Sequence, residues 1–121
     1  MEGHWIRLNR LFADRKRALI VAADHGMFVG PLDGIIDLPE AIEAWREADG
    51  ILVTPGMLRS CGHAFSYRGA PMAILRLDSS TVFGARWGFT GAQPSVVISP
   101  EAALAMGADL GMATFTISLT D

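Results

Sequence analysis

Four short and almost entirely apolar segments constrain the fold of this chain more than any other feature. They are residues 18–23 (ALIVAA), 51–54 (ILVT), 72–77 (MAILRL) and 112–118 (MATFTIS). Strands that are apolar on both faces are typical of a parallel sheet covered on each side. Each segment is followed by polar residues or glycines, and that is where α/β enzymes carry their chemistry.

Segments with helical character separate these strands. Residues 1–17 predict a short amphipathic helix that covers a barrel end or a sheet edge. A second helix is expected from Pro39 to its stop at Gly50, and a third from the N-cap Ser99 to about Met106. Residues 57–65 predict a short helix or an irregular crossover, and residues 24–38 and 82–94 predict long loops. The alternation of strand and helix indicates the α/β class.

Two architectures fit four such units in a chain of 121 residues. The first is the N-terminal half of a (β/α)8 TIM barrel, since a complete barrel takes roughly 250 residues. Here residues 1–17 form an N-terminal lead-in, and residues 18–121 form a half-barrel truncated after its fourth strand. The second is a compact flavodoxin-like sheet. A strand order of 1-2-3-4 with a curved sheet supports the half-barrel, whose concave face should be apolar and poorly covered. An order of 2-1-3-4 supports the open sheet.

Composition narrows the function classes. The net charge of −3 and the pI near 5.5 give no electrostatic case for binding nucleic acid or an anionic membrane. No apolar run approaches the ~20 residues that span a bilayer. The single cysteine, Cys61, excludes an internal disulfide and fits a reducing compartment. We therefore expect a cytoplasmic protein, and we expect neither a cofactor nor a metal ion.

Candidate site residues follow the expected strands. Asp24 and His25 end the first strand, where a carboxylate can hold a substrate hydroxyl or relay a proton. The structural alternative is that Asp24 caps the next turn and His25 bonds a neighbouring backbone group. Thr54 and Asp78, after the second and third strands, could line the same mouth, although ordinary turn and cap chemistry is the favoured explanation for each residue taken alone.

Other motifs give weaker evidence of a functional site. The glycines at 26, 30 and 34 do not have the spacing of a dinucleotide-binding turn or a P-loop. They indicate instead a flexible loop that covers an active site. His4, Cys61 and His63 lack the spacing of metal ligands.

Taken together, four stretches resemble a known family. They are VAADHGMFVGPLDGIID, GILVTPGMLR, APMAILRLDSST and VVISPEAALAMGADLGMATFTIS, and they cover about residues 18–118. They are similar to the N-terminal half of the DeoC/LacD-type class I aldolases, and particularly to archaeal-type fructose-bisphosphate aldolases and their thiolase-like relatives that act on phosphorylated ketones. The family's first strand ends in DHG, and its fourth follows a helix with the pattern S-x-E-x-A-x-x-x-G-A-D.

The resemblance implies a (β/α)8 barrel and cleavage or formation of a carbon–carbon bond through a Schiff base on a small phosphorylated carbonyl substrate. Asp24 matches the family's active-site aspartate, and His25 lies beside it. The resemblance places the lysine nucleophile on the sixth strand and the tyrosine acid/base on the fifth, beyond the four strands expected here. The only lysine, Lys16, precedes the first strand, and the only tyrosine, Tyr67, precedes the third.

Two functions therefore stay open. The first is an aldolase-family carbon–carbon lyase that lacks the lysine-bearing half. The second is a catalytically silent fragment or assembly module that completes a barrel with itself or with a complementing chain. Unpaired strand edges template association, so a homo-oligomer or a complex with a complementing chain is expected.

Overall fold

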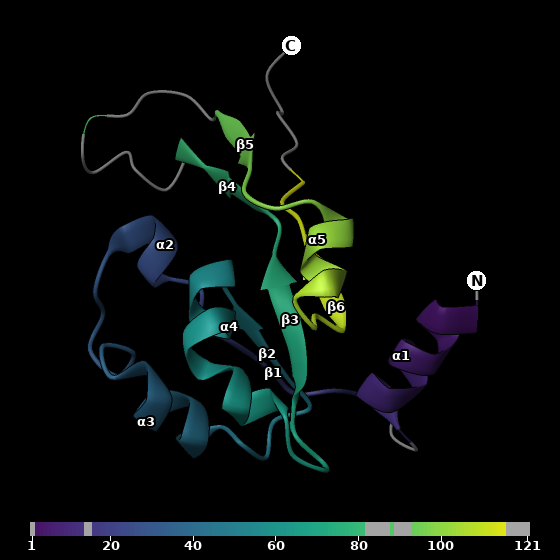
Figure 1. Cartoon of the computed structure of the whole chain (residues 1–121). Helices are drawn as coiled ribbons and strands as arrows, with labels where there is room; N and C mark the ends of the chain where they lie inside the picture. The colour runs from purple at the N-terminus through teal and green to yellow at the C-terminus, as the bar shows by residue number, and fades with distance from the viewer. Residues whose placement is uncertain (1, 14–15, 82–87, 89–92, 116–121) are drawn as a thin grey trace.

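Four parallel strands form the central sheet of the computed structural model, which describes residues 2–13, 16–81, 88 and 93–115 (Figure 1). They are β1 (Ile20–Ala22), β2 (Gly50–Val53), β3 (Met72–Arg76) and β6 (Leu110–Met112). Their order is β1-β2-β3-β6, so each strand pairs with the preceding strand of this sheet. This is the 1-2-3-4 order of half a (β/α)8 barrel. The predicted half-barrel is confirmed, and the reordered open sheet is wrong.

Helices connect these strands and begin at recognisable caps. They are α3 (Leu38–Ala44), α4 (Pro55–Cys61) with the 3-10 turn η1 (Gly62–Phe65), and α5 (Pro100–Ala105). Asp37, Thr54 and Ser99 each precede a helix, and each side chain accepts a hydrogen bond from the backbone N–H three residues later. A proline in the first turn of all three helices needs no hydrogen-bond partner there.

The helices cover one face of the sheet, where the core lies. Ile51 and Val53 of β2 and Leu75 of β3 are fully buried there against helical residues that include Ile42 and Cys61. Because side chains alternate along a strand, the residues between them point to the opposite, concave face.

Apart from Arg76 at the end of β3, the concave face is apolar along the strands, with side chains from Ile20, Ala22, Leu52, Met72, Ile74, Leu110 and Met112. The prediction that it is poorly covered holds only at the edge strands. Ile20 of β1 is 47% exposed and Met112 of β6 is 43% exposed, whereas Leu52 and Ile74 of the central strands are 3% and 6% exposed. The central side chains are flanked on both sides, and Gly50 leaves room for Ile74, since a Cβ at Gly50 would lie 2.9 Å from its Cδ1.

Several boundaries differ from those predicted. The first helix after β1 is α2 (Gly26–Val29), within the stretch expected to be a loop. The helix expected to run to Gly50 ends at Ala44, and Gly50 already belongs to β2. The fourth strand begins at Leu110 rather than at residue 112, because the backbone N–H of Asp109 already bonds Ala73 on β3. Residues 116–118 of the predicted strand lie outside the described residues.

A small ribbon and an N-terminal helix complete the described chain. β4 (Asp78–Ser80) and β5 (Pro94–Val96) pair antiparallel beyond the carboxyl end of β3. This ribbon was not predicted, and it overlaps the loop expected over residues 82–94 only at Pro94. Most of residues 82–92 lies outside the described part. α1 (Glu2–Phe12) projects from the amino end of the sheet (Figure 1). Arg10 ties it to the turn before β6 through a 2.7 Å ion pair with Asp109.

Candidate active site at the carboxyl end of the sheet

Asp24 lies two residues after the end of β1 and is only 5% exposed. The N–H of Ala23 bonds the carbonyl of Leu52, so the strand alignment continues up to Asp24, and side-chain alternation directs its carboxylate to the concave face. The backbone carbonyl of Asp24 accepts from Met27 N–H as α2 begins. The backbone therefore forms the turn, and the side chain is left to face Arg76, whose Nη1 lies 3.5 Å from Asp24 Oδ2.

Arg76, the last residue of β3, is also 5% exposed. It lies at the centre of a cluster of side chains formed with Asp24, Asp78, Thr114 and Phe28. Its Nε donates to the carbonyl of Asp78 at 3.1 Å and lies 3.2 Å from Asp78 Oδ1, and its Nη2 donates to the Thr114 hydroxyl. The ring of Phe28 on α2 stacks on the guanidinium, with 4.8 Å from Cζ to the ring centroid. A buried guanidinium needs such partners, because an unpaired buried charge is strongly unfavourable.

Asp78 links the end of β3 to the end of β6. Its Oδ2 accepts a 2.7 Å hydrogen bond from the backbone N–H of Thr114, which follows β6. Asp24, Arg76 and Asp78 thus bring two carboxylates to one guanidinium and leave a net negative charge at the carboxyl end. Such a site can hold a hydroxyl group through a carboxylate oxygen or take up a proton.

Two of the predicted site residues lie outside this cluster. The Thr54 hydroxyl accepts from Met57 N–H at 3.3 Å, so it serves as the N-cap of α4. His25 is exposed, and its side chain does not cap α2. Thr54 instead borders an adjacent hollow of about 530 Å³ between the α2–α3 segment and the start of α4, with mainly apolar walls that include Met27, Leu38 and Met57.

The sequence interpretation missed Arg76 and its partners Phe28 and Thr114. The sequence could have indicated Arg76, because it is the only charged residue in an otherwise apolar predicted strand. A charge buried in a sheet requires a counter-charge nearby. Phe28 lay in a stretch that was read as a loop. Thr114 lay inside the misplaced fourth strand, and nothing in its local sequence indicates its contact with Asp78.

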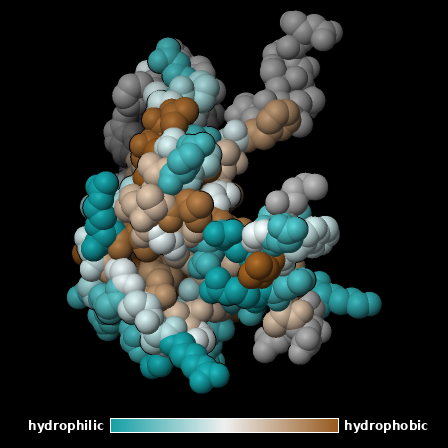
Figure 2. Space-filling model, turned by 45° about the vertical axis from the view of Figure 1, so that its right-hand side comes forward, coloured by the Kyte–Doolittle hydropathy of each residue, from teal (hydrophilic) through white to brown (hydrophobic). Residues whose placement is uncertain are grey.

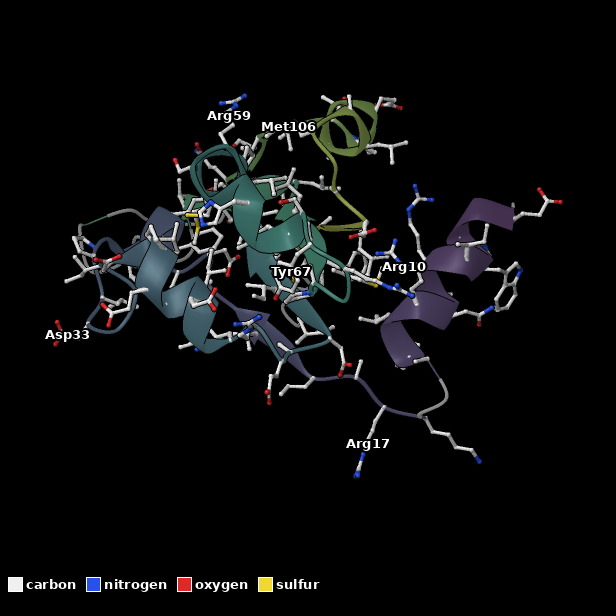
Figure 3. The ribbon with its side chains drawn as sticks, turned by 60° about the horizontal axis from the view of Figure 1, so that its bottom comes forward. Arg10, Arg17, Asp33, Arg59, Tyr67 and Met106 are labelled. Carbon is white, nitrogen blue, oxygen red and sulfur yellow. The ribbon has the colours of Figure 1, made fainter. Side chains whose placement is uncertain are left out.

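The groups with amine or phenol chemistry lie at the opposite end. Lys16 is exposed and precedes β1, as does Arg17, which points away from the body (Figure 3). Tyr67 precedes β3, and its hydroxyl donates to the carbonyl of Arg46 at 3.5 Å, with the Arg46 guanidinium over its ring. Within the described ranges, no three His, Cys, Asp or Glu side chains gather as metal ligands would. None of the helices described has the length and apolar character of a membrane span.

No protein-family model matches the chain. Proteins that are similar to it in sequence include an archaeal aldolase and an archaeal synthase. The chain is 42% identical over 85 residues to an uncharacterized aldolase of Saccharolobus solfataricus, and 32% identical over 84 residues to a 2-amino-3,7-dideoxy-D-threo-hept-6-ulosonate synthase of Halobacterium salinarum. The chain is related to a protein named as an aldolase.

The matched region is 69% and 68% of this chain, and 31% and 30% of the respective relatives. The chain thus spans less than a third of the length of the relatives it matches. The similarity supports an aldolase-like family at a coarse level, in agreement with the resemblance carried by the strand-end motifs.

Proposed function

We propose that this chain belongs to the DeoC/LacD-type class I aldolases and supplies the first-strand side of a site that makes or breaks a carbon–carbon bond in a phosphorylated sugar or ketone. The observation that carries the proposal is the buried Asp24–Arg76 pair at the carboxyl end of the half-barrel. Active sites of (β/α)8 enzymes lie at that end. The similarity to an aldolase-named protein supports the same reaction class.

In this proposal Asp24 is the group that meets the substrate. A carboxylate next to the reacting carbons can hold a substrate hydroxyl and accept its proton as the carbon–carbon bond breaks. Arg76 acts through Asp24 as a positioning residue, because its contacts with Asp78 and Thr114 hold the guanidinium in one place. His25 and Thr54 would border the substrate from the neighbouring turns.

The Schiff-base step needs a neutral amine at the same end of the barrel. Lys16 precedes β1, so it lies at the amino end, and it is exposed. We therefore propose that this chain by itself forms no Schiff base. The same observation favours a second candidate, a catalytically silent assembly module that presents the strand-end cluster without turning over substrate.

The two candidates are separated by ligand binding. With dihydroxyacetone phosphate as the probe, the lyase-site proposal expects shifts of the backbone amide resonances around Asp24 and Arg76, with weak affinity in the millimolar range. Asp24→Ala should abolish the shifts, and Asp49→Asn, at the amino end, should leave them intact. Absence of shifts at the carboxyl end would contradict the lyase-site proposal and favour the silent module.

The lysine argument has its own test. Borohydride reduction in the presence of the same ketone, followed by mass spectrometry of the intact chain, should give no covalent adduct. An adduct mapped to Lys16 would show that the amine reaches substrate and would overturn our placement of the nucleophile outside these strands.

A further inference from the structure

Asp24 and Arg76 are buried although they lie at the carboxyl end of the strands, next to exposed residues. Each is 5% exposed, whereas His25 and Gly26, which follow Asp24, are exposed. Part of the cover comes from α2, because the ring of Phe28 stacks on the Arg76 guanidinium with 4.8 Å between Cζ and the ring centroid. A ligand therefore meets Asp24 only if part of that cover moves.

α2 (Gly26–Val29) has few features that fix a helix in place. It has four residues, none of them is buried, and the side chain of His25 does not cap it. In contrast, α3, α4 and α5 each begin at a side-chain cap and each bury at least one residue. Segments with little buried apolar surface open locally at a low cost in free energy, so opening of α2 does not require the sheet to unfold.

Glycines stand at both ends of α2, where a hinge would have to bend. Gly26 is its first residue, and Gly30 follows its last with φ +78° and ψ −163°, a conformation that is essentially restricted to glycine. A Cβ at Gly30 would meet no atom beyond its chain neighbours within 4 Å, so only the backbone conformation requires glycine there. The N–H of Met27 donates to the carbonyl of Asp24, which ties the start of the helix to the residue that bears the carboxylate. Lid hinges are typically a few such positions at the ends of an element.

We propose that α2 is a lid over the Asp24–Arg76 pair, and that the stacking of Phe28 on Arg76 holds it closed. An aromatic ring attracts a guanidinium above its face, and the attraction is greater where water is excluded. Phe28 is partly exposed and the guanidinium is buried, so their contact lies at the boundary between lid and cluster. When α2 lifts, this face of the guanidinium and the carboxylate of Asp24 become accessible from the carboxyl end.

Opening of α2 also connects the cluster with the neighbouring apolar hollow of about 530 Å³. Met27 lines that hollow, and the next residue, Phe28, contacts Arg76. The same short helix thus contributes a wall to the hollow and a cover to the charged pair. With α2 lifted, a ligand that has an apolar part and a hydroxyl-bearing part has access to both. The inference does not depend on the proposed lyase function, because opening is measured on the cluster itself and without substrate.

Modification of arginine by phenylglyoxal, mapped by peptide mass spectrometry, tests the proposal on the full chain. The exposed Arg59 on α4 is the internal reference (Figure 3). In the wild type, Arg76 should react slowly but measurably below the urea transition, at a rate that urea hardly changes, because local opening exposes little surface. A rate at Arg76 that rises with urea as the unfolded fraction does would mean that only global unfolding exposes it, and would overturn the proposal.

Gly30→Ala strains the closed conformation without removing any atom that covers Arg76. We expect Arg76 to react at least about fivefold faster, with the rate at Arg59 unchanged. Gly69→Ala is the matched control, since Gly69 has a similar φ of +84° and open space at its Cβ position, but it precedes β3 at the amino end. Equal acceleration by the two substitutions would show that a general loss of stability exposes Arg76, and would contradict a lid.

Phe28→Leu keeps an apolar side chain but removes the aromatic ring, and it should raise the rate at Arg76 by about two- to thirtyfold. Trp5→Leu is its control, because Trp5 is 60% exposed on α1, the helix that Figure 2 shows projecting from the body of the molecule. This variant should leave the rate unchanged. Circular dichroism checks that each variant is folded. An unchanged rate at Arg76 in folded Phe28→Leu would also overturn the proposal, because the ring would then not hold the lid closed.

Discussion

The two ends of the sheet use aspartate in different ways. At the amino end, Asp49 Oδ2 accepts from the backbone N–H of Leu19 at 2.7 Å, and Asp109 Oδ2 accepts from that of Ala73 at 3.1 Å. Each of these aspartates immediately precedes a strand and bonds the backbone of the neighbouring one. At the carboxyl end, Asp24 instead faces the side chain of Arg76, and Asp78 combines both uses, since it accepts from the backbone N–H of Thr114 and also faces Arg76.

The difference separates a structural role from a chemical one. A carboxylate bonded to a backbone amide fixes the alignment of two strands, and an uncharged oxygen in the same place can replace it. The interaction of a carboxylate with a buried guanidinium requires the negative charge of the carboxylate. Two carboxylates around one guanidinium leave an excess of negative charge with which a ligand can interact. Substitutions at the two ends should therefore differ in their effect on stability.

The largest loss of stability is expected for Arg76→Met, because this substitution leaves Asp24 and Asp78 without their counter-charge. Loss of one partner of a buried ion pair destabilises a protein by about 3–5 kcal/mol. Urea denaturation gives the change in the free energy of unfolding. Arg46→Met is the control, since Arg46 pairs with Glu43 on the exposed surface and should change stability by less than about 1 kcal/mol. Equal losses in the two variants would remove the distinction.

Asp24→Asn should have the next largest effect, with a loss of about 1–3 kcal/mol, because the amide keeps the shape but not the charge beside Arg76. In the Arg76→Met background the same substitution should do less harm, with a coupling of about 0.5–3 kcal/mol in a double-mutant cycle. A coupling of zero would mean that the pair at 3.5 Å makes no energetic contribution.

At the amino end, Asp109→Asn should lower stability by less than about 1 kcal/mol, since an amide oxygen still accepts from Ala73 N–H. Asp109→Ala removes the acceptor and should lower it by about 1–2 kcal/mol. Urea denaturation of both variants measures this difference between Asn and Ala. If Asn is as harmful as Ala, charge matters at this end as well, through the ion pair with Arg10.

Cys61, in the core between helix and sheet, gives the smallest effect. Burial, and then the nearby Asp37 carboxylate, raises the pKa of its thiol. Its contribution to stability is therefore complete below the unfolded-state pKa of about 8.5 and is lost as the pH rises towards the higher folded-state pKa. The urea midpoint should fall more between pH 8 and pH 10 for the wild type than for Cys61→Ala. Parallel falls would contradict this assignment.

Sequence patterns predicted the parts of this molecule that depend on local chemistry. The early proline of α3 and the N-cap Ser99 of α5 were predicted from neighbouring residues, and the apolar runs predicted a parallel sheet. The cap Asp37 was not predicted, and α4 begins at Pro55, two residues before the predicted segment. The positions of Asp24 and Asp78 at one end follow from parallel strand direction alone. Their roles in binding or catalysis stay predictions.

What could not be predicted depends on distant contacts. The start of β6 is set by the hydrogen bond from the backbone N–H of Asp109 to the carbonyl of Ala73. The Thr114 hydroxyl can accept from Arg76 only once that strand is in place. α2 has four residues and no side-chain cap, so its local sequence gives little sign of a helix. Its contact between Phe28 and Arg76 favours that conformation.

The consecutive strand order also has a consequence for the time course of folding. Of the three parallel pairings, β2 with β3 closes the shortest stretch of chain, from Gly50 to Met72, and joins the two most deeply buried strands. Shorter loops lose less entropy on closure, so this pair is the natural nucleus, and β1 and β6 add to it later. A chain that folds from its centre outwards leaves the edge strands of its sheet unformed longest.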